Sequence, residues 1–256
     1  MDRRKFWYLF AAGIIYLALI SFPTYLFTED LYVLYGVELG LRAAYLVFII
    51  LFSIFTKIAK TYNGKTKITN FFLLLPLFFV AFFNLFYLAV VTRSSIPNPL
   101  EAVFNNEGNN TLIILKFVCI IITVVEEELL FRYIIQRNLA IGHKIVRILV
   151  TSAFFAASFF FKMLYDARGI IVPINLLSIF VIYGIGIILG FLYEYTNNII
   201  VPIAFSLIYA ICNEMLYEIT FEVATTKYYL TLLFFTLGAS AYLAIFYFLM
   251  LKKENR

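Results

Sequence analysis

The sequence predicts an all-α membrane protein, a polytopic bundle of about eight transmembrane helices in a single domain over residues 1–256. Hydrophobic residues make up 64% of the chain and charged residues only 14%. Soluble domains carry about half apolar and about a quarter charged residues. Aromatic residues form 20% of the chain, which suits packing against lipid and anchoring at its interfaces. The composition therefore excludes an ordinary soluble domain.

Long apolar runs define the predicted helices, because a helix that crosses the hydrocarbon core needs about 20 apolar residues. The predicted crossings are Phe6–Phe27, Leu39–Phe55, Phe71–Val91, Leu112–Leu130, Ile145–Phe161, Ile171–Tyr193, Ile199–Tyr217 and Tyr229–Leu251. The first run follows a basic segment, as in a signal peptide, but it has no clear small-residue cleavage site and is predicted to be retained. Gly186 and Gly190 in the sixth run predict a close approach of two helices.

Basic residues gather on alternate connections between these runs. Both ends of the chain are basic, and residues 56–70 carry four lysines. The intervening connections at residues 28–38 and 92–110 together carry a single basic residue, Arg93. Because lysine and arginine stay on the cytoplasmic side, this pattern predicts a multi-pass protein of the cell membrane with both termini in the cytoplasm. It also accounts for the net charge of +5 without a nucleic-acid partner.

Metal-binding and cofactor-binding patterns are absent from the sequence, so no metal and no cofactor is predicted. The two cysteines, Cys119 and Cys212, lie inside apolar runs and are predicted to be buried thiols.

The fourth run ends in an unusual set of charges, Glu126, Glu127 and Glu128, followed by Arg132. A charge at the centre of a membrane helix costs roughly 3 kcal/mol and normally faces the bundle interior or a wet cavity. Successive helical residues point about 100° apart, so three in a row cannot share one face. We expect Glu128 to pair with Arg132 along one face. We expect Glu127 to point into a cavity and Glu126 to reach cytoplasmic water.

Glu127, Glu128 and Arg132, with an aromatic residue just before the arginine, resemble the EExxxR signature of the CAAX-protease and bacteriocin-processing family (CPBP, also called ABI). Members of that family are intramembrane proteases, and the resemblance covers a core of residues 112–217. It implies that one glutamate activates water as a general base. It also implies that two histidines and an asparagine on later helices assist that base and stabilise the oxyanion.

The later helices depart from the family pattern. When the remaining family motifs are aligned with these helices, Phe159 falls at the first histidine position, Ser206 at the second and Ala210 at the asparagine position. The single histidine of the chain, His143, lies in a polar connection and is predicted to be exposed. The resemblance therefore implies a pseudoprotease that keeps the glutamates and the arginine without competent chemistry.

Three further polar residues are candidates for supporting this relic site. Asn213 lies about one turn beyond Ala210 and fills the asparagine position in a shifted register. Lys162 and Glu214 are candidates for a salt bridge that replaces lost contacts; alternatively, both lie at helix ends near water.

The leading interpretation is a non-catalytic bacterial scaffold that regulates a membrane protein or a membrane-anchored enzyme of the cell envelope. The bacterial origin is inferred from the abundance of Ile, Phe, Asn, Lys and Tyr, which indicates an AT-rich genome. One alternative is an active glutamate-dependent intramembrane peptidase for CAAX-like or other peptide substrates. Another is a small transporter or lipid-binding protein, since intramembrane charges also mark substrate paths. The absence of a detectable internal repeat argues against a transporter.

Overall fold

The part of the chain that the structure, a computed structural model, describes is almost entirely helical. This part consists of residues 3–20, 22, 30–56, 80, 82, 110–139, 142–163, 176–220 and 226–254. The elements are α1 (Arg3–Ile20), α2 (Leu31–Phe55), α5 (Asn110–Glu128), the π-helix η2 (Leu129–Gln136), α6 (Lys144–Met163), α7 (Leu176–Thr196), α8 (Ile200–Thr220) and α9 (Thr226–Glu254). No strand occurs within these residues, which confirms the predicted all-α class.

The third predicted crossing, Phe71–Val91, lies outside the described residues apart from Val80 and Phe82. The count of eight crossings therefore stays a prediction. The remaining seven predicted runs each correspond to a helix of the structure.

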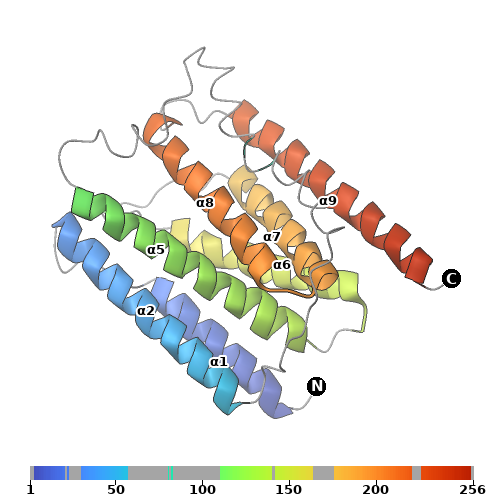
Figure 1. Ribbon diagram of the computed structural model, residues 1–256, viewed down its shortest axis with the longest axis horizontal. Coiled ribbons are helices and arrows are strands. Elements are labelled where there is room, and N and C mark those ends of the chain that lie inside the picture. The colour runs from blue at the N-terminus through green and yellow to red at the C-terminus, as the bar shows by residue number, and fades with distance from the viewer. Residues whose placement is uncertain are drawn as a thin grey trace.

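The helices run roughly along one common direction (Figure 1). Helix α5 lies in the middle, with α2 packed on one side and α8 on the other, and α7 packs against both α6 and α9. The start of α1 and the end of α9 lie at the same end of the bundle (Figure 1). The fourth predicted run is thus the central element, so its charges meet neighbours on several sides.

Two helices of the described part, Tyr32–Phe55 and Leu177–Thr196, are long and apolar enough to cross a membrane. Helix α7 is apolar all round and mostly buried, as expected of an inner helix of a bundle. Large apolar side chains elsewhere point outward, including Phe55, Phe234 and Ile245, which are 81%, 73% and 61% exposed. Outward faces of this kind suit contact with hydrocarbon rather than with water.

The second helix begins earlier than its apolar run predicts. We expected an external connection over residues 28–38, but α2 begins at Leu31, and the Asp30 carboxylate accepts a hydrogen bond from the Tyr32 backbone N–H at 2.8 Å. This side-chain cap satisfies one of the N–H groups that the first turn leaves without a partner. Glu38 lies within the helix and pairs with Arg42 at 3.7 Å, so its charge is compatible with the helix.

The two glycines of the sixth predicted run allow α7 to lie close to α6, which confirms that prediction. A Cβ atom added at Gly186 would lie 3.0 Å from the Ser152 Cβ, and one added at Gly190 would lie 2.7 Å from the Ile148 Cγ2. Both contacts are tighter than side chains normally make, so neither position leaves room for a methyl group.

Replacing Gly190 with alanine should lower the free energy of unfolding by about 1–3 kcal/mol, because the added methyl overpacks the interface between α6 and α7. The measurement is denaturant unfolding in detergent micelles. The matched control is Gly238→Ala on α9, where an added Cβ meets nothing within 4 Å. That variant should be unchanged or more stable by up to about 1 kcal/mol. Equal stability of the two variants would contradict the close approach.

Candidate functional site

The glutamate cluster lies where α5 changes into the π-helix η2, Leu129–Gln136. A π-helix closes i→i+5 hydrogen bonds, is rare, and is frequently found at functional sites. We expected one regular α-helix here, because the apolar run contains no residue that indicates a π-helix. Six of its eight residues are buried, including Arg132 and Gln136. The motif therefore spans the junction between the two elements, with the glutamates at the end of α5 and Arg132 on the π-helix.

The three glutamates are buried, with only 0%, 5% and 1% of Glu126, Glu127 and Glu128 exposed. Each one contacts a different helix, as the rotation of about 100° between successive residues requires. Glu126 forms an ion pair with Arg42 of α2.

The other two carboxylates meet hydroxyl groups. The Tyr16 hydroxyl of α1 donates a hydrogen bond to the Glu127 carboxylate at 2.7 Å. The Ser206 hydroxyl of α8 donates one to the Glu128 carboxylate at 2.9 Å. The cluster thus binds α1, α2 and α8 to α5.

One expectation for this cluster is wrong. Glu126 does not reach cytoplasmic water, because a buried arginine 84 residues away in the sequence neutralises it inside the bundle. Glu127 is not among the residues that line the cavity described below, but Tyr16, whose hydroxyl bonds its carboxylate, does line it. The expectation that Glu127 points into a cavity stays a prediction. The pairing of Glu128 with Arg132 is confirmed, with the Arg132 Nε 3.4 Å from the Glu128 carboxylate.

Arg132 is completely buried beneath this cluster. Its guanidinium lies over the Phe155 ring of α6, with 5.2 Å from Cζ to the ring centroid, which adds a cation–π attraction to the pairing with Glu128. One further nitrogen, Nη1, lies 3.5 Å from the Gln136 side-chain oxygen. The Nη2 group has no hydrogen-bond partner among the described residues. The arginine thus joins α5, η2 and α6.

Gln136 is a site residue that the sequence reading missed. Its side-chain amide donates to the Gly190 carbonyl at 3.1 Å and to the Glu194 carboxylate at 3.4 Å. Glu194 in turn pairs with Arg147 of α6 at 2.7 Å. Its spacing in the sequence could have identified it. Gln136 follows Arg132 by four residues, as Arg132 follows Glu128, so polar residues continue along one face of the helix.

The positions that the family pattern assigns to histidines hold other groups. Ser206 lies against Glu128, so the structure does bring this position to the cluster. Phe159 packs its ring against Phe155 at 5.0 Å between centroids, within the apolar core rather than in a polar pocket. Ala210 is half-buried on α8, one turn beyond Ser206. His143 is exposed ahead of α6, as predicted.

Lys162, Asn213 and Glu214 belong to α6 and α8, but their side chains lie outside the described part of the chain, so their supporting roles stay predictions. Cys119 and Cys212 are buried free thiols. Across the described ranges, no group of three or more His, Cys, Asp or Glu side chains is arranged to hold a metal ion.

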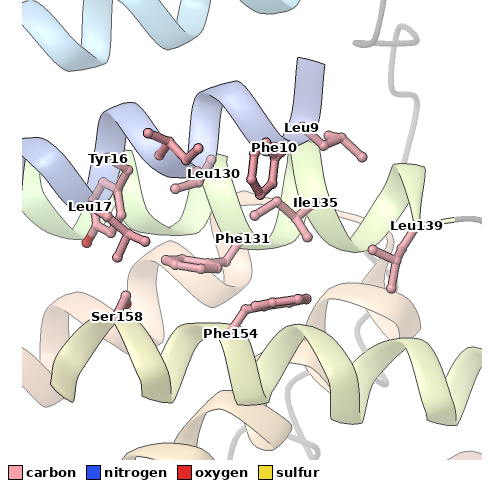
Figure 2. A pocket seen from close by; sticks show the side chains of 12 residues that line it. Leu9, Phe10, Tyr16, Leu17, Leu130, Phe131, Ile135, Leu139, Phe154 and Ser158 are labelled. Carbon is pink, nitrogen blue, oxygen red and sulfur yellow. The ribbon is translucent and has the colours of Figure 1, made fainter. Parts of the chain in front are cut away.

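A cavity of about 240 Å³ lies next to the cluster, between α1, η2 and α6 (Figure 2). Figure 2 shows Leu130 and Phe131 of η2 on one wall, with Phe154 and Ser158 of α6 opposite and Tyr16 of α1 at one end. The cavity therefore touches the cluster only through Tyr16.

The central segment of the chain resembles a known protein family. Residues 109–213 match the family model described as type II CAAX prenyl endopeptidase Rce1-like. No curated protein and no solved structure matches the chain. The matched segment contains the three glutamates, Arg132 and Ser206, whereas Tyr16 and Arg42 lie before it.

Breaking the ion pair between Arg42 and Glu126 should destabilise the protein strongly. Removing one partner of a buried pair leaves the other charge uncompensated and typically costs about 3–5 kcal/mol, whereas replacing both with apolar residues restores much of that loss. Arg42→Met and Glu126→Met should each lower the free energy of unfolding by about this amount, and the double variant by much less.

The control is Glu38→Gln, which removes the half-buried partner of Arg42 and should cost no more than about 1 kcal/mol. The measurement is denaturant unfolding in micelles. Additive losses in the double variant would contradict the pairing.

Proposed function

Since residues 109–213 belong to the Rce1-like branch of the CPBP family, which is membrane-embedded, we propose that the protein is a non-catalytic member that acts as a membrane scaffold or regulator of a partner protein. The observation that carries this proposal is the engagement of all three glutamates by protein groups. A general base must reach a water molecule or a substrate proton within hydrogen-bond distance. Here the carboxylate of the motif glutamate Glu127 accepts a hydrogen bond from the Tyr16 hydroxyl.

The partners of these carboxylates support a structural use of the motif. Arg42 and Tyr16 belong to helices that precede the matched segment, so the N-terminal part of the chain supplies the groups that neutralise Glu126 and cover Glu127. Ser206, at a histidine position, supplies a second hydroxyl and donates a hydrogen bond to the Glu128 carboxylate. Each contact compensates in part for the burial of a carboxylate, and Glu128 is also paired with Arg132.

The residues at the histidine positions also support a loss of chemistry. Phe159 offers no donor and no base, and the Ser206 hydroxyl is turned toward a carboxylate rather than toward a developing oxyanion. Loss of a single oxyanion donor lowers the rate by about two to three orders of magnitude. The loss of both imidazoles together removes the constellation rather than one part of it.

In this proposal the bundle is a multi-pass protein of a bacterial cell membrane with both termini in the cytoplasm. Its partner is a membrane protein or a membrane-anchored enzyme of the cell envelope. The support is physical: the charged network fixes the helices from within, while apolar side chains such as Phe154, Phe180 and Ile200 remain exposed on the outside. A rigid bundle with apolar outer faces can hold another helix in the bilayer through packing alone.

Replacing Glu127 with glutamine should leave the cellular function unchanged within about twofold, because the amide oxygen still accepts the Tyr16 hydrogen bond and no chemistry depends on the charge. Loss of a general base would instead lower peptidase activity by about 10²–10⁴-fold. The measurement is complementation of a deletion strain, together with cleavage of candidate membrane peptides by the purified protein.

Crosslinking to a partner protein in the native membrane tests the scaffold role directly. A photoreactive residue at Phe154 or Phe180, both more than half exposed, should crosslink the same membrane protein in the wild type and in Glu127→Gln. The control is the same photoreactive residue at the buried Ile188. A wild type that cleaves peptides while the variant does not would overturn the proposal, and so would a chain that crosslinks to no protein from its native membrane.

A further inference from the structure

The cavity between α1, η2 and α6 has walls that are suited to hydrocarbon. Of its twelve lining residues, only Tyr16 and Ser158 carry a polar side-chain group. The Tyr16 hydroxyl donates to Glu127, and the Ser158 hydroxyl donates to the Phe155 carbonyl at 2.7 Å. Both donors are thus directed into the protein. A water molecule needs two to four polar partners to stay in a cavity, and these walls do not provide them.

The mouth of the cavity lies on the outer surface of the bundle. Phe10 and Ile14 of α1 and Phe154 of α6 line the cavity and are also 51%, 49% and 54% exposed. Both helices are predicted crossings in a protein whose family is membrane-embedded, so this outer surface faces the hydrocarbon of the bilayer. The cavity therefore opens sideways into the lipid, at the depth of the buried glutamates.

The opening into the lipid limits what can fill the cavity. An empty space of about 240 Å³ forfeits the dispersion contacts of every wall atom, and water gains too few hydrogen bonds to fill it. A peptide segment would bring backbone N–H and C=O groups that these walls cannot satisfy. A flexible hydrocarbon chain restores the dispersion contacts of the walls and brings no polar group that needs a partner. In a bilayer, hydrocarbon chains are also the most concentrated molecules at the opening of the cavity.

We propose that the cavity is a lipid site, in which one acyl chain of a bilayer phospholipid enters between α1 and α6 and lies against η2. The chain fills the space beside Phe131, while the polar head group stays outside the bundle. Its contacts connect α1, which carries Tyr16, to the two elements that carry the motif and Phe155. This site goes beyond the scaffold role proposed above and does not require a partner protein.

Gly13 provides the means of testing this site. It lines the cavity, and a Cβ added there meets nothing within 4 Å, so a larger side chain can grow into the cavity without first displacing the backbone. Gly36 of α2 is the matched control, because it is also free of neighbours within 4 Å and does not line the cavity.

The experiment reconstitutes the full chain in phosphatidylcholine vesicles that contain a phosphatidylcholine with a diazirine in its acyl chain. After illumination, mass spectrometry locates the adducts. In the wild type, adducts should form at the buried Leu130 and Phe131 as well as at the exposed Phe234 of α9. In Gly13→Phe, labelling of Leu130 and Phe131 should fall about tenfold, the change produced by a loss of about 1.4 kcal/mol in binding, while labelling of Phe234 persists.

Gly36→Phe should label like the wild type. Gly13→Leu, a smaller change, serves if Gly13→Phe does not fold, as judged by size-exclusion chromatography and circular dichroism. Absence of adducts at Leu130 and Phe131 in the wild type would overturn the proposal, and so would equal labelling in the Gly13 and Gly36 variants. The labelling does not depend on cellular function or on partner capture, so this result and that of the scaffold proposal are separable.

Discussion

The burial of three consecutive carboxylates is the constraint on which the rest of this structure depends. A charge removed from water destabilises a protein unless an opposite charge or hydrogen bonds compensate for it. Because Glu126, Glu127 and Glu128 point in three directions, compensation has to come from three neighbouring helices. Arg42, Tyr16 and Ser206 provide it, and their positions place α2, α1 and α8 around α5.

The polar contacts continue from this cluster along the bundle. Arg132 follows Glu128, Gln136 follows Arg132, and Glu194 with Arg147 carries the series to α6 and α7. The π-helical turns allow this stripe to face inward, and Gly190 brings the α7 backbone within reach of Gln136. The family motif is therefore part of a connected framework. In the proposed non-catalytic role, a framework of this kind gives the glutamates and the arginine a structural use that needs no histidine.

The sequence predicted the helices, the pairing of Glu128 with Arg132 and the exposure of His143, because each depends on local periodicity or on composition. It did not predict the contacts of Glu126 and Glu127, whose partners lie 84 and 111 residues away, since local patterns carry no information on such pairings. Arg42, a charge inside the apolar run Leu39–Phe55, was the signal available for the first of them. The π-helix had no signal, because the apolar residues around it fit a regular helix equally well.

The proposed role depends on the motif glutamate Glu127 being held by the protein itself. The most direct measurement is a double-mutant cycle on Tyr16→Phe and Glu127→Met, followed by denaturant unfolding in micelles. A hydrogen bond to a charged group contributes about 1.5–3 kcal/mol, so the two changes should couple by about this amount. Additive effects, with coupling below about 0.5 kcal/mol, would show that Glu127 does not depend on Tyr16 and would contradict the account.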